Sequence, residues 1–272
     1  MEFLGRPKGF GLVMLAAIAL EIVWRLAFAR RRYDGWAAAA SFGVAAGNLA
    51  AGAVSIAALG AIYAALWRIA PVHWPVDDWR TWIAAFMAVE FAYYWQHRFS
   101  HTVRWMWATH SVHHSAEEFT LPAAIRLGWT SLISGAWLMF VPLILAGFNP
   151  LMVLGLMALD LHYQFFLHTE AVGRLGPLEW VLNTPRHHRV HHASNPSLLD
   201  KNFGGVVIVF DRLFGTFAEA PDEEPLRYGL THPVGSKNPF AIAFHEWGRL
   251  AADLRRARSP REAVALALGR PT

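Results

Sequence analysis

The chain contains no cysteine among its 272 residues. This absence excludes disulfide bonds, cysteine-ligated iron–sulfur clusters and thiolate-ligated haem. The chain also lacks a nucleotide-binding Gly-rich loop, an internal repeat and a low-complexity segment. Charged residues are scarce, at 16% of the chain, and despite a net charge of +4 they do not form the aromatic-interleaved basic face of a nucleic-acid-binding domain. We therefore expect no nucleic-acid partner.

Apolar residues are abundant instead. Hydrophobic residues make up 55% of the chain, which has 13 Trp and 18 Phe and a mean hydropathy of +0.28. This composition favours an integral membrane protein over a soluble domain. A membrane-spanning helix needs about 20 mostly apolar residues. The sequence predicts five such helices, which begin at Phe10, Trp36, Thr81, Trp129 and Leu151.

Charged and turn-forming residues add detail to these predicted spans. Glu21 and Arg25 lie four residues apart in the first span, so we expect them to pair on one helix face. Residues 129–148 and 151–167 are joined only by an Asn-Pro break, which predicts a tight hairpin. The first span is followed by three arginines at 30–32, and this pattern predicts a cytoplasmic end there. Counting crossings from that end places the ends of the third and fifth spans on the cytoplasmic face as well.

Histidines are concentrated in short motifs near those ends. Residues 97–101 read HRFSH, residues 110–114 read HSVHH, and residues 187–192 read HHRVHH, which contains a second HxxHH motif. Histidines three or four residues apart project from one face of a helix, the geometry that one metal ion requires. The fifth predicted span ends in a polar stripe at steps of four residues, formed by Asp160, Gln164 and His168.

The motifs supply nine candidate metal ligands: His97, His101, His110, His113, His114, His168, His188, His191 and His192. Nine imidazoles exceed the number that one metal ion binds, and they fit two ions with four or five ligands each. His187 is a candidate tenth ligand. Neutral imidazole binds zinc, copper, iron and nickel, so the ligand type alone leaves the metal open. A structural zinc site usually has four ligands and favours cysteine, which this chain lacks.

Two carboxylates accompany these histidines within the predicted spans. Glu90 lies two helical turns before His97, and Asp160 lies two turns before His168. Ionisable groups inside a span are costly and usually face a functional cavity. Both carboxylates are therefore candidates for orienting ligand imidazoles through the second ring nitrogen, with simple helix pairing as the alternative.

The chain resembles the fatty acid hydroxylase superfamily, also called the sterol desaturase family, and within it the alkylglycerol monooxygenase-like branch. The resemblance rests on EFAYYWQHRFSH ending at His101, WATHSVHHSAEEF ending at Phe119, YQFFLHTE ending at Glu170 and NTPRHHRVHH ending at His192. KNFGG (201–205) and FDRLFGTF (210–217) resemble the closing motifs of the family. These segments occur in the order that is typical of the family.

The resemblance implies an all-α integral membrane fold, with four to five transmembrane helices and a cytoplasmic helical cap that carries a di-iron site. It divides the chain into N-terminal transmembrane helices (1–80), a catalytic domain (81–217) and a cytoplasmic C-terminal tail (218–272). The metal-ligand role is carried over to His97 and His101 from the HxxxH box, to the HxxHH histidines 110, 113, 114, 188, 191 and 192, and to His168. This chain has Gln164 where some relatives have a histidine, which leaves one ligand position to water or His187.

The implied reaction is the O2-dependent hydroxylation of a fatty-acyl, alkyl-ether or sterol-like lipid that enters from the bilayer. It would use two iron ions that change between Fe²⁺ and Fe³⁺, and electrons from an external reductase, a small electron carrier or a reduced pterin. The alternatives are a lipid desaturase and a non-catalytic metal-binding membrane protein. We expect a multi-pass protein with a cytoplasmic catalytic face, in the plasma or inner membrane of a bacterium or the endoplasmic reticulum of a eukaryote.

Overall fold

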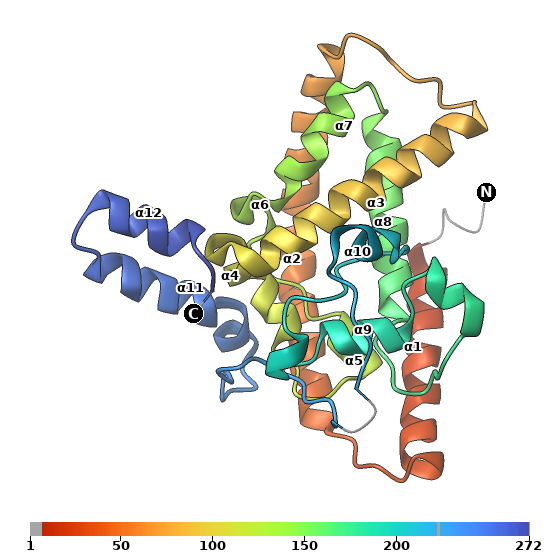
Figure 1. The fold of residues 1–272 in the computed structure, drawn as a ribbon, viewed down its shortest axis with the longest axis vertical. Coiled ribbons are helices and arrows are strands. Elements are labelled where there is room, and N and C mark those ends of the chain that lie inside the picture. Colours follow the sequence, from red (N-terminus) through yellow and green to blue (C-terminus); the bar gives the residue numbers. More distant parts are fainter. Residues whose placement is uncertain (1–6, 222–223, 272) are drawn as a thin grey trace.

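The computed structural model describes residues 7–221 and 224–271 (Figure 1). Helices form all the named secondary structure of these residues. Bridges between extended segments are limited, in this part of the chain, to Leu182 with Val207 and Ala193 with Tyr228. The predicted all-α class is therefore confirmed for the described residues.

Two long helices near the N-terminus are candidates for crossing a membrane. α1 (Pro7–Val23) continues into the π-helical turn η1 (Trp24–Phe28), and α2 (Gly35–Arg68) follows. The candidate spans Gly9–Phe28 and Gly35–Arg68 both have a mean hydropathy of 2.0, and only 17% and 11% of their apolar windows are buried. Because their apolar side chains face mostly outward, these helices are suited to contact with lipid.

The prediction of five spans is not confirmed by the described residues. α3 (Trp79–Thr102) forms where the third span was expected, but its last turns are polar and it is not among the candidate spans. α8 (Pro150–Phe165) forms where the fifth was expected, and its 16 residues fall short of the length that crosses a bilayer, about 20 residues. Length and composition therefore support two spans in the described chain.

The prediction of one continuous helix over residues 129–148 is wrong. This segment instead forms α6 (Ser131–Ser134), the 3-10 helix η2 (Ala136–Phe140) and α7 (Val141–Leu145). Gly135, between the first two elements, has a φ of +74°. This left-handed conformation ends a helix, and glycine adopts it without steric cost.

The main apolar core lies where the second half of α2 meets α3, α7 and α8 (Figure 1). Its most deeply buried members, each at most 2% exposed, are Tyr63, Ala85, Val89, Phe140, Ile144 and Val153. The hydroxyl of Tyr63 donates to the carbonyl oxygen of Trp137 at 2.8 Å, so the one polar group in this set is satisfied.

Shorter helices lie between and after the long ones. They are α4 (Arg104–His114), α5 (Leu121–Ala124), η3 (Gly176–Trp180), α9 (Pro185–His191), η4 (Pro196–Leu198) and α10 (Val209–Phe214). The segment expected to be a C-terminal tail forms α11 (Pro239–Arg256) and α12 (Pro260–Leu268), and both helices pack against α4 (Figure 1). Arg104 of α4 is 1% exposed and donates to Glu246 at 3.1 Å and to Asp253 at 2.7 Å. These two ion pairs tie α11 to the helix that carries the HSVHH motif.

Candidate metal centre

The structure brings the nine sequence-predicted histidines into two adjacent groups. In each group the candidate ligand atoms lie within 4.8 Å of one another. The first, the five-histidine group, consists of His97, His101, His110, His114 and His191. The second, the four-histidine group, consists of His113, His168, His188 and His192. Every member is buried except His110, which is partly exposed.

Helix periodicity explains how the two HxxHH motifs serve both groups. On α4, His110 and His114 are four residues apart and share a face, while His113 is rotated by about 100° from His114. His110 and His114 therefore join the five-histidine group and His113 joins the four-histidine group. α9 and its C-cap residue reverse this division, since His188 and His192 join the four-histidine group and His191 the other. The two motifs thus face each other and supply both groups.

The ring nitrogens fit a metal-binding role. Nε2 of His97 lies 3.0 Å from Nε2 of His110, and Nε2 of His168 lies 3.1 Å from Nε2 of His113. Two imidazoles bound at right angles to one ion, with metal–nitrogen bonds of about 2.1 Å, would place their nitrogens about 3.0 Å apart. The spacing of these nitrogens is therefore the spacing of neighbouring ligands on a shared ion.

The second nitrogens of several rings are held by backbone carbonyls. Nδ1 of His97 lies 2.9 Å from the Phe203 carbonyl oxygen, and Nδ1 of His191 lies 2.9 Å from that of Lys201. Nδ1 of His168 lies 2.7 Å from the Gln164 carbonyl oxygen. Such contacts require the proton on Nδ1 and leave the Nε2 lone pair directed at the centre.

Two buried nitrogens of the five-histidine group have no hydrogen-bond partner among the described residues. They are Nε2 of His101 and Nε2 of His191. A buried polar atom without a partner is costly, and coordination to a metal ion would remove that cost. The donor set consists of neutral nitrogens and suits iron, copper, zinc or nickel. The residues therefore fit the metal pair that the sequence implies.

Burial keeps the imidazoles of α4 and α9 neutral at physiological pH. It lowers the pKa of His113 to about 4. Burial, with neighbouring imidazoles as the next cause, holds the pKa values of His114, His188 and His192 well below their usual range. Because only the neutral ring offers a lone pair to a metal, these histidines are available as ligands without losing a proton.

The two predicted supporting carboxylates, Glu90 and Asp160, belong to neither histidine group. Oε2 of Glu90 accepts hydrogen bonds from the backbone of Val206 at 2.9 Å and of Val207 at 2.8 Å. Asp160 is 2% exposed and accepts a hydrogen bond from the side chain of Gln164 at 2.8 Å. Among the described residues, neither carboxylate accepts a hydrogen bond from a ligand imidazole. Glu90 holds the segment whose Phe203 carbonyl contacts His97, and Asp160 holds Gln164, whose carbonyl contacts His168.

His187, the candidate tenth ligand, lies outside both groups. Its ring packs edge-on against Phe217 at 5.3 Å between centroids. Its carbonyl oxygen accepts a hydrogen bond from the side chain of Asn202 at 3.0 Å. Burial lowers its pKa to about 4. In this structure His187 therefore packs α9 against Phe217.

Three residues near the centre were not singled out from the sequence. Phe119, 3% exposed, stacks on the ring of His168 at 5.5 Å. Asp200 lies 3.6 Å from Nδ1 of His101. Asp211, 0% exposed, accepts hydrogen bonds from the backbone that positions Phe203 and Gly204. The signal for Asp211 was a carboxylate beside Arg212 within the FDRLF motif, whose other residues are apolar.

A pocket of about 270 Å³, called the polar pocket below, opens onto both histidine groups. Its lining includes His101, His114 and His191 of the five-histidine group and His192 of the four-histidine group, together with Asp200 and Arg270. The Arg270 guanidinium pairs with Asp200 at 3.2 Å. The pocket offers small polar molecules a path to the centre.

Comparison with known proteins identifies the segment that carries both groups. The family model described as fatty acid hydroxylase matches residues 82–216. The chain is 46% identical over 170 residues to alkylglycerol monooxygenase of Danio rerio, a match that covers 62% of this chain and 37% of that protein. It is 46% identical over 172 residues to alkylglycerol monooxygenase of Homo sapiens, covering 63% and 38%.

A bacterial relative extends this comparison. The chain is 28% identical over 181 residues to an ornithine lipid hydroxylase of Rhizobium tropici, a match that covers 65% of this chain and 54% of that protein. No solved structure matches the chain. The chain matches less than two-fifths of the length of the two alkylglycerol monooxygenases named above.

Proposed function

The chain belongs to the fatty acid hydroxylase superfamily, in its alkylglycerol monooxygenase-like branch, and from this premise we propose that it hydroxylates a lipid by means of two iron ions and O2. The relatives named above act on alkylglycerols and ornithine lipids by name. The substrate proposed here is accordingly a membrane lipid with an alkyl, acyl or sterol-like apolar part.

One observation carries the proposal: nine histidines from separate stretches of the chain form two adjacent groups of five and four. A single structural metal would need about four ligands. Two groups side by side, each rich in neutral nitrogen, favour a pair of ions over one structural ion. The relatives named above are a monooxygenase and a hydroxylase by name, which favours redox-active ions. The five-histidine group and the four-histidine group would each hold one iron.

When bound, the iron pair would supply the redox chemistry with O2 that attack on an unactivated C–H bond requires. The chain itself holds the ligand rings in fixed orientation. The carbonyls of Phe203 and Gln164 set the orientation of His97 and His168, and buried aromatic rings limit the access of water. Phe203, 1% exposed, packs edge-on against His101 at 5.2 Å between centroids.

The overall reaction determines how many electrons and protons must be supplied. One atom of O2 enters the C–H bond as a hydroxyl group and the other leaves as water, which consumes two electrons and two protons from outside the lipid. The electrons would come from a reductase, a small electron carrier or a reduced pterin. Small polar reactants can approach the centre through the polar pocket beside His101.

Membrane association follows from the family and from the exposed apolar faces of α1 and α2. We place the catalytic side and the 30–32 arginine loop in the cytoplasm, following the positive-inside pattern. Because the natural chain has no cysteine, single-cysteine variants can map this topology. An impermeant maleimide is added outside intact cells. Arg31→Cys and Arg270→Cys should both react with it only after the membrane is permeabilised. Opposite accessibility of the two positions would contradict the placement.

The test of the function is iron content together with lipid-dependent O2 uptake in purified, membrane-reconstituted protein. We expect about two irons per chain, and a His113→Ala variant that retains its fold but loses uptake. A lipid product that gains one oxygen atom supports hydroxylation, whereas a product that loses two hydrogens supports the desaturase alternative. Bound zinc without turnover would support a non-catalytic metal-binding protein and overturn the proposal.

A further inference from the structure

An apolar groove lies between α1 and α2, away from the polar pocket. Its volume is about 560 Å³, within the range of about 300–1,000 Å³ that is typical of ligand sites. Its lining includes Leu12, Leu15 and Ile18 of α1, Phe42 of α2, and Ile125. None of its lining side chains is polar. Since both walls belong to the candidate membrane spans, the groove is open to molecules dissolved in the bilayer core.

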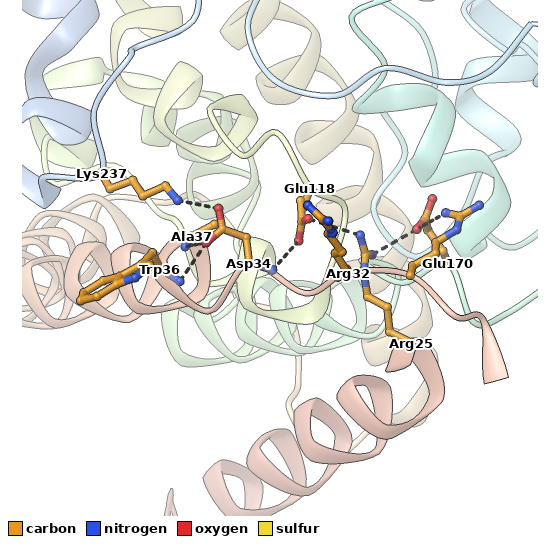
Figure 2. A network of polar contacts seen from close by, with 9 residues as sticks. Arg25, Arg32, Asp34, Trp36, Ala37, Glu118, Glu170 and Lys237 are labelled. Carbon is orange, nitrogen blue, oxygen red and sulfur yellow. Dashed lines mark hydrogen bonds and ion pairs between the residues drawn. The ribbon is translucent and has the colours of Figure 1, made fainter. Parts of the chain in front are cut away.

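Arg25, in the turn η1 that continues the wall helix α1, pairs with two carboxylates that follow metal-ligand candidates in the sequence (Figure 2). It is 8% exposed, and its guanidinium lies 3.2 Å from the Glu170 carboxylate and 3.6 Å from that of Glu118. Glu170 follows His168 by two residues, and Glu118 follows His114 by four. The predicted pairing of this arginine with Glu21 is therefore replaced by contacts with ligand-bearing loops. A helix that served only as an anchor would not need a buried ion pair of this kind.

Glu21 makes a second such contact at the start of α5. It is 5% exposed, and its carboxylate accepts a hydrogen bond from the backbone of Leu121 at 2.7 Å. α5 leads directly into Ile125, which lines the groove. The next residue, Arg126, places its carbonyl oxygen 3.3 Å from Nδ1 of His113. The groove lining is thus adjacent in sequence to a residue that contacts the four-histidine group.

The pocket and the groove therefore differ in chemistry. The pocket borders the five-histidine group and His192 and contains charged residues, whereas the groove has apolar side chains only and is linked to the four-histidine group through Ile125 and Arg126. A lipid has the same two parts, a polar end and an aliphatic chain. Asp200 and Arg270 in the polar pocket disfavour a long chain there, because charged groups lose hydration without gaining partners when methylenes cover them.

We propose that the groove between α1 and α2 binds the aliphatic chain of the lipid substrate and directs it toward the four-histidine group. This inference rests on the proposed function. A chain in the groove contacts Ile125, the residue that follows α5, before it reaches the histidines, so Ile125 and the α1 wall select for chain length. Each additional buried methylene strengthens binding by about fourfold until the groove is filled.

The test uses the full chain in phosphatidylcholine vesicles and a single-chain lipid that carries a diazirine on its alkyl chain. Light should attach the probe to residues 11–18 or to Ile125, and an excess of the same lipid without diazirine should compete. Leu15→Trp fills the groove and should reduce this labelling by about tenfold or more, because it displaces several methylene contacts. Leu20→Trp is the matched control, since Leu20 is 71% exposed on α1 and does not line the groove. It should label as the unchanged chain does.

Labelling that maps elsewhere, that the competitor does not reduce, or that Leu15→Trp leaves unchanged would overturn the groove proposal. Iron content and the Michaelis constants for substrates of different chain length complete the test. Leu15→Trp should raise the Michaelis constant for long chains by about tenfold and leave that for short chains within about twofold. If the unchanged chain binds the probe in the groove but shows no O2-dependent turnover, the proposed function fails and the lipid site stands. If turnover is normal and chain-length preference does not respond to Leu15→Trp, only the groove is refuted.

Discussion

Asp211 links α10 to the loop beneath His97, and its replacement by asparagine tests whether that loop positions a metal ligand. The carboxylate is 0% exposed and accepts three hydrogen bonds, each at 2.7 Å, from the backbone of Phe203, the backbone of Gly204 and the hydroxyl of Thr216. The carbonyl oxygen of Phe203 in turn lies 2.9 Å from Nδ1 of His97. A change at Asp211 should therefore reach the five-histidine group through one peptide unit.

The size of the effect follows from which bonds asparagine can keep. In asparagine, one of the two carboxylate oxygens is replaced by an NH2 group. That group would face either the Gly204 N–H or both the Phe203 N–H and the Thr216 hydroxyl. At least one hydrogen bond to a charged acceptor is lost, at a cost of about 1.5–3 kcal/mol. Asp211→Ala loses all three bonds and should cost about 4 kcal/mol or more. Because the loop also orients a ligand, Asp211→Asn should weaken metal binding by about 10- to 100-fold.

The assay combines thermal unfolding of the metal-free protein with chelator competition for bound iron. Glu219→Gln is the control, since that carboxylate is about half exposed and pairs with Arg186 at 3.2 Å on the surface. It should change stability by less than about 1 kcal/mol and leave iron affinity unchanged. If Asp211→Asn matches the control in both measurements, the loop does not hold His97 and the reasoning is refuted.

Three other predictions concern packing and protonation. Gly205→Ala should reduce both iron content and stability, because a β-carbon there would overlap the buried Asp160 carboxylate, whereas Gly173→Ala, which meets open space, should do neither in the same assays. Ile144→Ala, at a 0% exposed core position, should lower the free energy of unfolding by about 2–5 kcal/mol in denaturant titrations. Burial lowers the pKa of His245, so the folded state binds fewer protons than the unfolded state and its contribution to stability should be lost as pH falls below about 6.5. His245→Gln should remove this part of the pH dependence of the melting temperature, and an unchanged profile would show that the histidine does not titrate as described.

The helical fold was only partly predictable from apolar run length. The runs near the N-terminus predicted α1 and α2 because an apolar stretch of that length has few other stable states. The run from 129 to 148 is also mostly apolar, yet Gly135 adopts a left-handed conformation there and divides it. Hydropathy does not register such a break, since it counts apolar residues and ignores backbone angles.

The partners of charged residues were also hidden in the sequence. Glu21 and Arg25 have the spacing of a helix pair, but each contacts a residue more than 90 positions away in the sequence. Asp211 looked like part of a short closing motif, and only the folded chain places it under Phe203. Local spacing predicts which side chains share a face, whereas tertiary packing decides what that face meets.

By itself the sequence determined the identity of the nine histidines in the centre, because spacings of three and four residues fix the directions of side chains on a single helix. Only the tertiary structure decided how they are divided, with His113 apart from His110 and His114, and His191 apart from His188 and His192. It also placed His187 outside both groups. The physical reason is that α4 and α9 are far apart in sequence, so the angle at which they face each other depends on packing that no local pattern records.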